Sequence, residues 1–266
     1  MRILSLVSQK GGVGKTTLAL NLSYAFASRG QRTLLVDVDP QGAIGHSLPS
    51  APSSPGIVGY LSGRAMAERV IIATRLPTLR ILPLGELAPS DTRRFSEHLS
   101  SGAAIDRLAS AVAADVDLMI IDTPCGFGGA TEGALRASDA ALTPLQAEPI
   151  AIRTLPQLLE MIATLRSEGS VVSLVGAVLT MLQLRDESSL DVAQEAWARL
   201  PSELVLETTV PRDPVFLAAS ARGVPLGLLA RKPPPVFRVF DQLADEIATR
   251  LSTEQEEADE PLDLFA

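Results

Sequence analysis

The stretch Gln9-Lys10-Gly11-Gly12-Val13-Gly14-Lys15-Thr16-Thr17 decides the fold of this 266-residue chain. It follows the apolar run Ile3 to Ser8 and leads into a helical stretch, Thr16 to Ala27. Glycines between a strand and a helix let backbone N–H groups turn inward around phosphate oxygens, and the helix N-terminus directs its partial positive charge at the same anion. In such a loop Lys15 reaches the β- and γ-phosphates, and the Thr16 hydroxyl ligates Mg²⁺. The stretch therefore predicts a phosphate-binding loop.

Apolar runs rich in Val, Ile and Leu recur along the chain, with helical stretches between them. Continuous runs of this kind are typical of strands buried on both faces of a parallel sheet. The expected strands are Arg2 to Ser8, Thr33 to Val38, Leu79 to Pro83, Leu118 to Asp122, Ala140 to Leu145 and Val172 to Leu179. The expected helices are Thr16 to Ala27, Ala103 to Ala114, Leu155 to Arg166, Ser189 to Arg199 and Val236 to Leu251. This alternation predicts a single-domain, doubly wound α/β fold with a mostly parallel sheet.

Composition and charge divide the chain into a domain, residues 1–251, and an acidic tail, residues 252–266, which we expect to be disordered. The net charge is -8, and six acidic residues lie in the tail, so the rest of the chain is near -2 (-8 + 6 = -2). Pro261-Leu262-Asp263-Leu264-Phe265 could serve as a short partner-binding motif, although a solvated tail is the simpler interpretation. Pro49 to Gly56 is a surface loop by composition.

Cysteine content and hydropathy exclude several classes of protein. The only cysteine, Cys125, rules out an internal disulfide and an all-cysteine metal or iron–sulfur site within one chain. The sequence contains neither a long uncharged apolar stretch nor a signal-peptide layout, so we expect a soluble cytoplasmic protein.

Carboxylates lie at the C-terminal ends of two of the expected strands. Asp37 and Asp39 stand at alternate positions at the end of the second strand, and Asp122 ends the apolar run Leu118 to Ile121. The carboxyl ends of parallel strands form the ligand crevice in folds of this class. An acid that ends an apolar strand is what a Walker B motif requires for contact with Mg²⁺, and Asp122 fills that position.

The phosphate loop resembles the deviant Walker A motif of the ParA/MinD family of P-loop ATPases. Position 9 is Gln rather than Gly, and Lys10 matches the signature lysine of that family. The resemblance implies that Lys10 reaches the phosphate of the partner subunit in a nucleotide-sandwich homodimer, with Lys10, Lys15 and Asp39 as catalytic residues. It also implies Mg²⁺ ligation by Thr16, Asp39 and Asp122. ATP would be bound by Lys10, Gly11, Gly12, Val13, Gly14, Lys15, Thr16 and Thr17.

Later segments extend the resemblance over roughly residues 1–250. Leu179-Thr180-Met181 and Val210-Pro211-Arg212-Asp213 are similar to the family's base-contacting segments, which implies nucleotide contacts from Met181, Pro211 and Asp213. One departure is the stretch Cys125 to Gly129, which stands where the family often has a second proline. Its glycines favour a mobile switch loop.

The sequence is closest to the ParA (Soj)-like branch. The acidic C-terminal stretch disfavours membrane attachment of the MinD type. The resemblance then implies a slow ATPase at the nucleoid that binds DNA non-specifically as an ATP dimer and positions a chromosome, plasmid or protein complex. A ParB-like or other adaptor protein would stimulate hydrolysis. The candidate DNA contacts are Arg185, Arg212, Arg222 and Arg238.

A metabolic P-loop ligase or small-molecule kinase is the alternative function. Such an enzyme needs a pocket for an acceptor substrate. The sequence shows no His or Cys constellation for one, since His46 and His98 are isolated. The signature lysine favours the dimeric switch.

Overall fold

One eight-stranded sheet organises the chain, which a computed structural model describes for residues 1–48, 53–146, 149–183, 186–187, 190–191, 193–194, 198 and 200–259. The strands lie in the order β3-β4-β2-β5-β1-β6-β7-β8, and the described neighbours are parallel except β3 and β4. This confirms the predicted doubly wound α/β fold. The strands are β1 Arg2–Ser8, β2 Thr33–Asp37, β3 Ile72–Ala73, β4 Leu79–Leu82, β5 Leu118–Cys125, β6 Ala140–Gln146, β7 Ser173–Leu182 and β8 Val210–Pro211.

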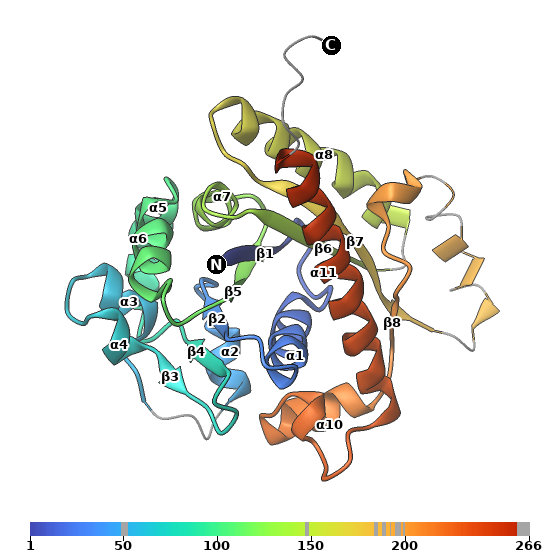
Figure 1. The fold of residues 1–266 in the computed structure, drawn as a ribbon, viewed down its shortest axis with the longest axis horizontal. Coiled ribbons are helices and arrows are strands. Elements are labelled where there is room, and N and C mark those ends of the chain that lie inside the picture. The colour runs from blue at the N-terminus through green and yellow to red at the C-terminus, as the bar shows by residue number, and fades with distance from the viewer. Residues whose placement is uncertain are drawn as a thin grey trace.

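Helices cover both faces of the sheet (Figure 1). The α-helices are α1 Lys15–Ser28, α2 Ala43–Ser47, α3 Gly56–Leu61, α4 Ala67–Val70, α5 Thr92–Leu99, α6 Ala103–Val112, α7 Gly129–Arg136, α8 Pro149–Ser167, α10 Val215–Arg222 and α11 Arg238–Asp259. Short 3-10 turns are η1 Pro89–Asp91, η2 Ser202–Leu204, η3 Leu226–Leu228 and η4 Pro235–Phe237. Among the described helices, none combines the length and apolar character needed to cross a bilayer.

The side chains of β1 alternate between the two faces of the sheet and show which helices cover each face. Leu4 and Leu6 lie in the core that α1 and α11 cover, whereas Ile3 and Val7 point to the opposite face. Helices α5, α6 and α7 cover Ile3 on that opposite face, and α8 lies beside Val7. Both faces of the central strands are thus buried, which explains why the strands read as continuous apolar runs.

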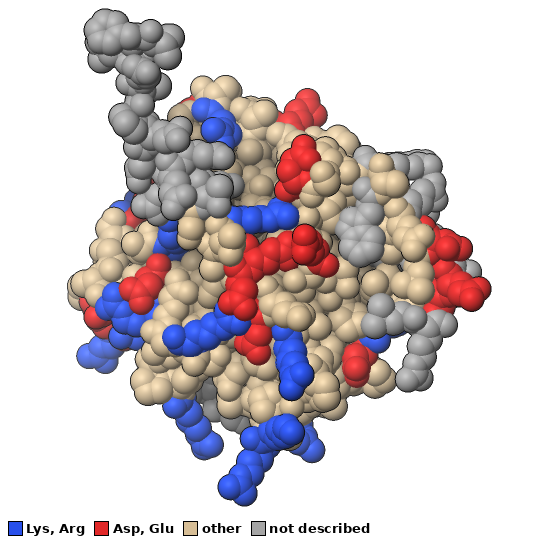
Figure 2. Space-filling model, turned by 45° about the vertical axis from the view of Figure 1, so that its right-hand side comes forward, with Lys and Arg blue, Asp and Glu red and all other residues tan. Residues whose placement is uncertain are grey.

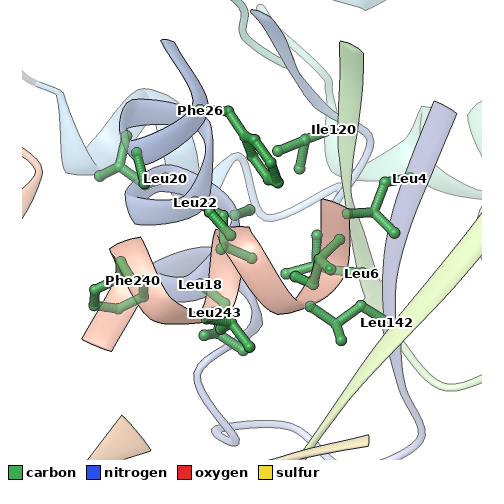
Figure 3. Close-up of a cluster of buried hydrophobic side chains, with 14 of the residues drawn as sticks. Leu4, Leu6, Leu18, Leu20, Leu22, Phe26, Ile120, Leu142, Phe240 and Leu243 are labelled. Carbon is green, nitrogen blue, oxygen red and sulfur yellow. The ribbon is translucent and has the colours of Figure 1, made fainter. Parts of the chain in front are cut away.

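The core between the sheet and the α1–α11 pair fixes the start of α1. Figure 3 shows its side chains converging from three directions: the strands contribute Leu4, Leu6, Ile120 and Leu142, α1 contributes Leu18, Leu20, Leu22 and Phe26, and α11 contributes Phe240 and Leu243. Each fully buried side chain of this size contributes roughly 1.5–3 kcal/mol. The loop before α1 is therefore held at the carboxyl end of β1 by a large apolar interface.

Several elements differ from the sequence-based expectations. The last helix ends at Asp259 rather than Leu251, and no proline or glycine interrupts it before Pro261. The motif Pro261 to Phe265 and most of the expected helix Ser189 to Arg199 lie outside the described residues. Strand β5 continues to Cys125 and α7 begins at Gly129, so the expected switch loop is limited to three residues, 126–128.

Candidate nucleotide site

The phosphate loop spans the gap between β1 and α1 at the carboxyl edge of the sheet. Strand β1 lies between β5 and β6, so the loop opens where the chain connections depart in opposite directions, the usual ligand position in this architecture. Gly12 and Gly14 have φ angles of 77° and 92°, which side chains other than glycine rarely adopt, and Gly14 caps α1. Lys15 is only 8% exposed. A buried ammonium at a helix N-terminus is stabilised by an anion, so this geometry fits a phosphate.

Asp122 carries an unsatisfied charge beside this loop. Both of its carboxylate oxygens are buried, and neither accepts a hydrogen bond from the described residues. Burial raises the pKa of Asp122 to about 7, with Asp39 raising it further, whereas the nearby Thr16 hydroxyl and Lys15 ammonium act in the opposite direction. Leaving a buried carboxylate without partners is costly, and a cation relieves that cost.

Asp37 is a second buried carboxylate, and it lies opposite Asp122 in the register of β2 and β5. Burial and the charge of Asp122 raise the pKa of Asp37 to about 8. Its oxygens accept the backbone N–H of Asp39 at 3.0 Å and of Ile44 at 3.1 Å. Asp39 in turn accepts the N–H of Gln41 at 2.9 Å. Asp37 therefore shapes the turn that presents Asp39 at the edge of the sheet.

The residues at this edge fit Mg²⁺. The described residues contain no group of three or more His, Cys, Asp or Glu side chains arranged as a metal site of their own. Nucleotide-bound Mg²⁺ generally takes one or two carboxylates and completes its octahedron with phosphate oxygens and waters. The orphaned oxygens of Asp122 supply such a ligand position, and Thr16 and Asp39 are the neighbouring side chains that would share the ion.

A cavity of about 480 Å³ adjoins the loop on the α10 side. Its lining brings the three predicted base contacts, Met181, Pro211 and Asp213, to the same space as the loop and the start of α1. The backbone of Met181 has a φ of 57°, which is rare for residues other than glycine. The hydroxyl of the preceding residue, Thr180, donates to the Val13 carbonyl at 2.9 Å. The remaining lining residues are Gly14, Thr17, Leu18, Val210, Arg212, Pro214, Phe216 and Leu217.

Comparison with known proteins identifies the family to which this chain belongs. A family model described as an AAA domain matches residues 1–173. The sporulation initiation inhibitor protein Soj of Bacillus subtilis is 31% identical over 250 residues, which cover 93% of this chain and 98% of Soj. The chromosome partitioning protein ParA of Caulobacter vibrioides is 31% identical over 267 residues, or 97% of this chain and 98% of that protein. The chain belongs to the ParA/Soj family of P-loop ATPases.

Solved structures agree on the fold. McdA of Cyanothece superposes with a TM-score of 0.78 at 19% identity and covers 93% of this chain and 99% of McdA. A cobyrinic acid a,c-diamide synthase of Mycobacterium smegmatis, solved with an ATP analogue and magnesium, has a TM-score of 0.74 at 28% identity, with 92% of this chain and 93% of that one covered.

The signature lysine of this ParA/Soj-family chain lies at the outer side of the loop. Lys10 is partly exposed, and its carbonyl accepts the hydroxyl of Ser8 at 3.1 Å. Cys125 is exposed, and its Sγ lies 3.9 Å from the position that a Cβ on Gly11 would take. The thiol thus borders the phosphate loop, and it belongs to the stretch in which the family often has a second proline.

The predicted DNA-contacting arginines are spread along the C-terminal third of the chain. Arg212 lines the cavity described above, and its N–H donates to the Leu182 carbonyl. Arg222 ends α10, and Arg238 begins α11 with its side chain exposed. Arg185 lies outside the described residues. The structure brings Arg212 to the nucleotide cavity, whereas Arg222 and Arg238 are not among the residues that line it.

Some residues of the site were not foreseen from the sequence. The roles of Phe216 and Leu217 in the cavity depend on the placement of α10. Leu217 is 76% exposed although it is a large apolar residue, and that unusual exposure is a signal only the structure provides.

Proposed function

We propose that this chain is an ATPase that dimerises with ATP, binds DNA without sequence preference in that state, and positions a chromosome, plasmid or protein complex. A ParB-like or other adaptor protein would release it by stimulating hydrolysis. One observation carries the proposal: the lysine-bearing phosphate loop faces an unpaired buried carboxylate, in a chain aligned with Soj and ParA over nearly its whole length.

The chain's own residues would divide the chemistry among them. Backbone N–H groups of the loop and the Lys15 ammonium would hold the β- and γ-phosphates, with the base in the cavity beside Met181 and Pro211. Mg²⁺, when bound, supplies charge neutralisation on the phosphates. Asp39 would orient the attacking water, and Lys10 would reach the phosphate held by a second copy. Hydrolysis should be slow until the dimer and an adaptor hold Lys10 and Asp39 in place.

The DNA-binding part of the proposal has support from the distribution of charge. Residues 214–240 carry four basic side chains and no acidic one, although the whole chain has a net charge of -8. Figure 2 shows Lys and Arg side chains projecting along the lower end of the molecule, the end at which Figure 1 draws α10. A local basic surface is sufficient for non-specific binding, because phosphate contacts supply its free energy. The four residues are Arg222, Arg231, Lys232 and Arg238.

The deciding experiment measures binding to random-sequence duplex DNA by fluorescence anisotropy with ATP, ADP or no nucleotide, over a salt series. We expect binding only with ATP. Each phosphate contact removed, by Arg185→Ala, Arg222→Ala or Arg238→Ala, should lower the slope of log affinity against log salt by about 1. Arg93→Ala is the matched control, since Arg93 lies on the distant α5 and is 90% exposed. Equal binding in all three nucleotide states, or none at low salt, contradicts the proposal.

A second measurement tests the dimer switch. Asp39→Ala should leave ATP binding intact and accumulate an ATP-bound dimer on a sizing column, because the water is no longer positioned for hydrolysis. Lys10→Ala should abolish both the dimer and the stimulated hydrolysis. Fast turnover of purified wild-type monomer that survives Lys10→Ala contradicts the role of Lys10 across the dimer.

The metabolic alternative keeps one observation in its favour. The diamide synthase named above is 28% identical and matches most of both chains. A ligase of that kind consumes ATP only with its acceptor acid and an amino donor. ATP hydrolysis that is accelerated by DNA together with an adaptor, and is unchanged by cobyrinic acid with an amino donor, favours the positioning ATPase. The reverse pattern favours the ligase.

A further inference from the structure

One buried amide joins the phosphate-loop helix to the C-terminal third of the chain. Asn21 lies on α1 and is 3% exposed. Its Nδ2 donates to the Thr17 carbonyl at 2.8 Å, and its Oδ1 accepts the backbone N–H of Leu226 at 2.8 Å. The second contact links residues 205 positions apart. A single side chain therefore touches both the first turn of α1, beside the phosphate loop, and the turn η3.

Close packing makes this contact rigid. A Cβ on Gly227 would lie 2.0 Å from Cε1 of Tyr24, so only a glycine lets η3 approach α1 this closely. Tyr24 also packs edge-on against Phe237 with ring centroids 5.6 Å apart. We call Asn21, Tyr24, Leu226 and Gly227 the α1–η3 joint. Asn21 is almost fully buried, so losing its amide hydrogen bonds would leave buried polar groups unpaired.

The basic segment 214–240 runs through this joint. Arg222 precedes η3, and its guanidinium donates to the Leu229 carbonyl at 2.9 Å. Arg231 and Lys232 lie a few residues after η3, which ends at Leu228. The start of the same segment lines the nucleotide cavity through Phe216 and Leu217, opposite Gly14 and Thr17. A nucleotide in the cavity would contact the segment at one end and the first turn of α1 at the other.

We propose that Asn21 is a positioning residue that transmits the nucleotide state from Thr17 to η3 and so sets the placement of the basic side chains on either side of it. The inference rests on the proposed ATP-dependent DNA binding. A shift of the Thr17 carbonyl on nucleotide binding moves the Asn21 amide, and the amide moves Leu226 because no other described acceptor takes that N–H.

Hydrogen–deuterium exchange of the full chain tests the coupling without DNA. In the wild type, Mg-ATP analogue should slow exchange in the peptide covering residues 223–229 by about tenfold relative to the nucleotide-free protein. Asn21→Ala should abolish that change while fluorescent ATP still binds with an affinity within about threefold of wild type, since Asn21 does not line the cavity. Asn21→Asp keeps an acceptor for Leu226 but loses the donor to Thr17, so it should protect η3 equally with and without nucleotide.

Arg29→Ala is the matched control. Arg29, at the C-terminal end of α1, contacts α11 through its ion pair with Asp245 and a hydrogen bond to the Asp241 carbonyl at 2.6 Å. It has no contact with Thr17 in the described structure. This variant removes a surface contact between the end of α1 and α11, and it should keep the nucleotide-dependent protection of η3. In the DNA assay, Asn21→Ala should reduce the ratio of affinities with ATP and with ADP by about tenfold or more, and Arg29→Ala should not.

The outcomes separate the two proposals. If nucleotide does not protect residues 223–229 in the wild type, or if either Asn21 variant keeps the wild-type difference in exchange between the nucleotide-bound and nucleotide-free protein, the role of Asn21 is wrong. Should Asn21→Ala fail to fold, Asn21→Asp decides the question by the same measurement. Nucleotide-dependent protection that requires Asn21, in a protein that binds no DNA in any state, supports the α1–η3 joint and refutes the DNA-binding function.

Discussion

At pH 8, replacing Asp122 by Asn should stabilise the protein in the absence of metal and nucleotide while it weakens the binding of Mg-ATP. The carboxylate is buried without hydrogen-bond partners among the described residues. Asn has nearly the same shape and no charge, so it removes the electrostatic cost of this site and also the ligand that would hold Mg²⁺. A residue kept only for packing would not show opposite effects on stability and ligand binding.

The pKa shift gives the magnitude and the pH dependence. The pKa of Asp122 is raised from 3.8 to about 7 in the folded protein. Between these values the unfolded chain binds fewer protons than the folded one, so stability falls as pH rises and levels off above the folded pKa. At about 1.36 kcal/mol per unit, the wild type loses between 2 and 3 kcal/mol from pH 5 to pH 8 through this group. Asn lacks this loss, although its unpaired amide costs roughly 1–3 kcal/mol at every pH.

Urea unfolding in EDTA at pH 5 and pH 8 measures the effect. The free energy of unfolding of Asp122→Asn relative to wild type should increase by about 2–3 kcal/mol between the two pH values. Asp115→Asn is the control, because Asp115 is 66% exposed and lies 3.7 Å from Arg80 at the surface, where little change is expected. A difference between Asp122→Asn and wild type that stays constant or shrinks from pH 5 to pH 8 refutes the reasoning.

Two further predictions concern packing and the loop. Gly133→Ala should destabilise the protein by about 2–4 kcal/mol despite the better helix propensity of Ala, because its Cβ would lie 1.7 Å from the Leu99 carbonyl oxygen. Gly128→Ala is the control, since no atom lies within 4 Å of its Cβ, and it should change stability by less than about 1 kcal/mol. Equal urea midpoints for the two variants would contradict this prediction. Maleimide labelling of Cys125, whose thiol borders Gly11, should slow about tenfold at a Mg-ATP concentration ten times the dissociation constant, and an unchanged rate would exclude a phosphate beside the thiol.

Much of the fold could be predicted from the sequence, because the strands that build its centre are buried on both faces. β1 was predicted with its exact ends and β2 to within one residue. The two-residue strands β3 and β8 carry no periodic signal of their own and exist only because a neighbouring strand pairs with them. Helix α7 was also missed. Its glycines indicate a loop by propensity, whereas Gly133 is required where α5 and α7 touch.

The candidate site was predictable in its motifs but not in its electrostatics. Lys15, Thr16 and Asp122 stand at spacings that identify a phosphate loop and a Walker B strand. The sequence also placed Asp37 beside Asp39, yet only the register of β2 against β5 sets Asp37 opposite Asp122. The contrast between the two acids follows from their surroundings. Asp37 uses its oxygens to hold the turn before α2, and Asp122 keeps its oxygens unpaired.

The long-range contact of Asn21 had no local signal in the sequence, and the coupling that we propose between the nucleotide site and the C-terminal third depends on it. A polar residue in an apolar helix face is usually read as a solvent-exposed position, and its partner is 205 residues away. Because the amide is buried and uses both its donor and its acceptor, it costs little as long as Thr17 and Leu226 keep their relative positions. Any ligand that moves one of them must move the other or break a buried hydrogen bond. In the proposed coupling, the free energy of these two hydrogen bonds links nucleotide binding at the phosphate loop to the placement of the basic segment 214–240.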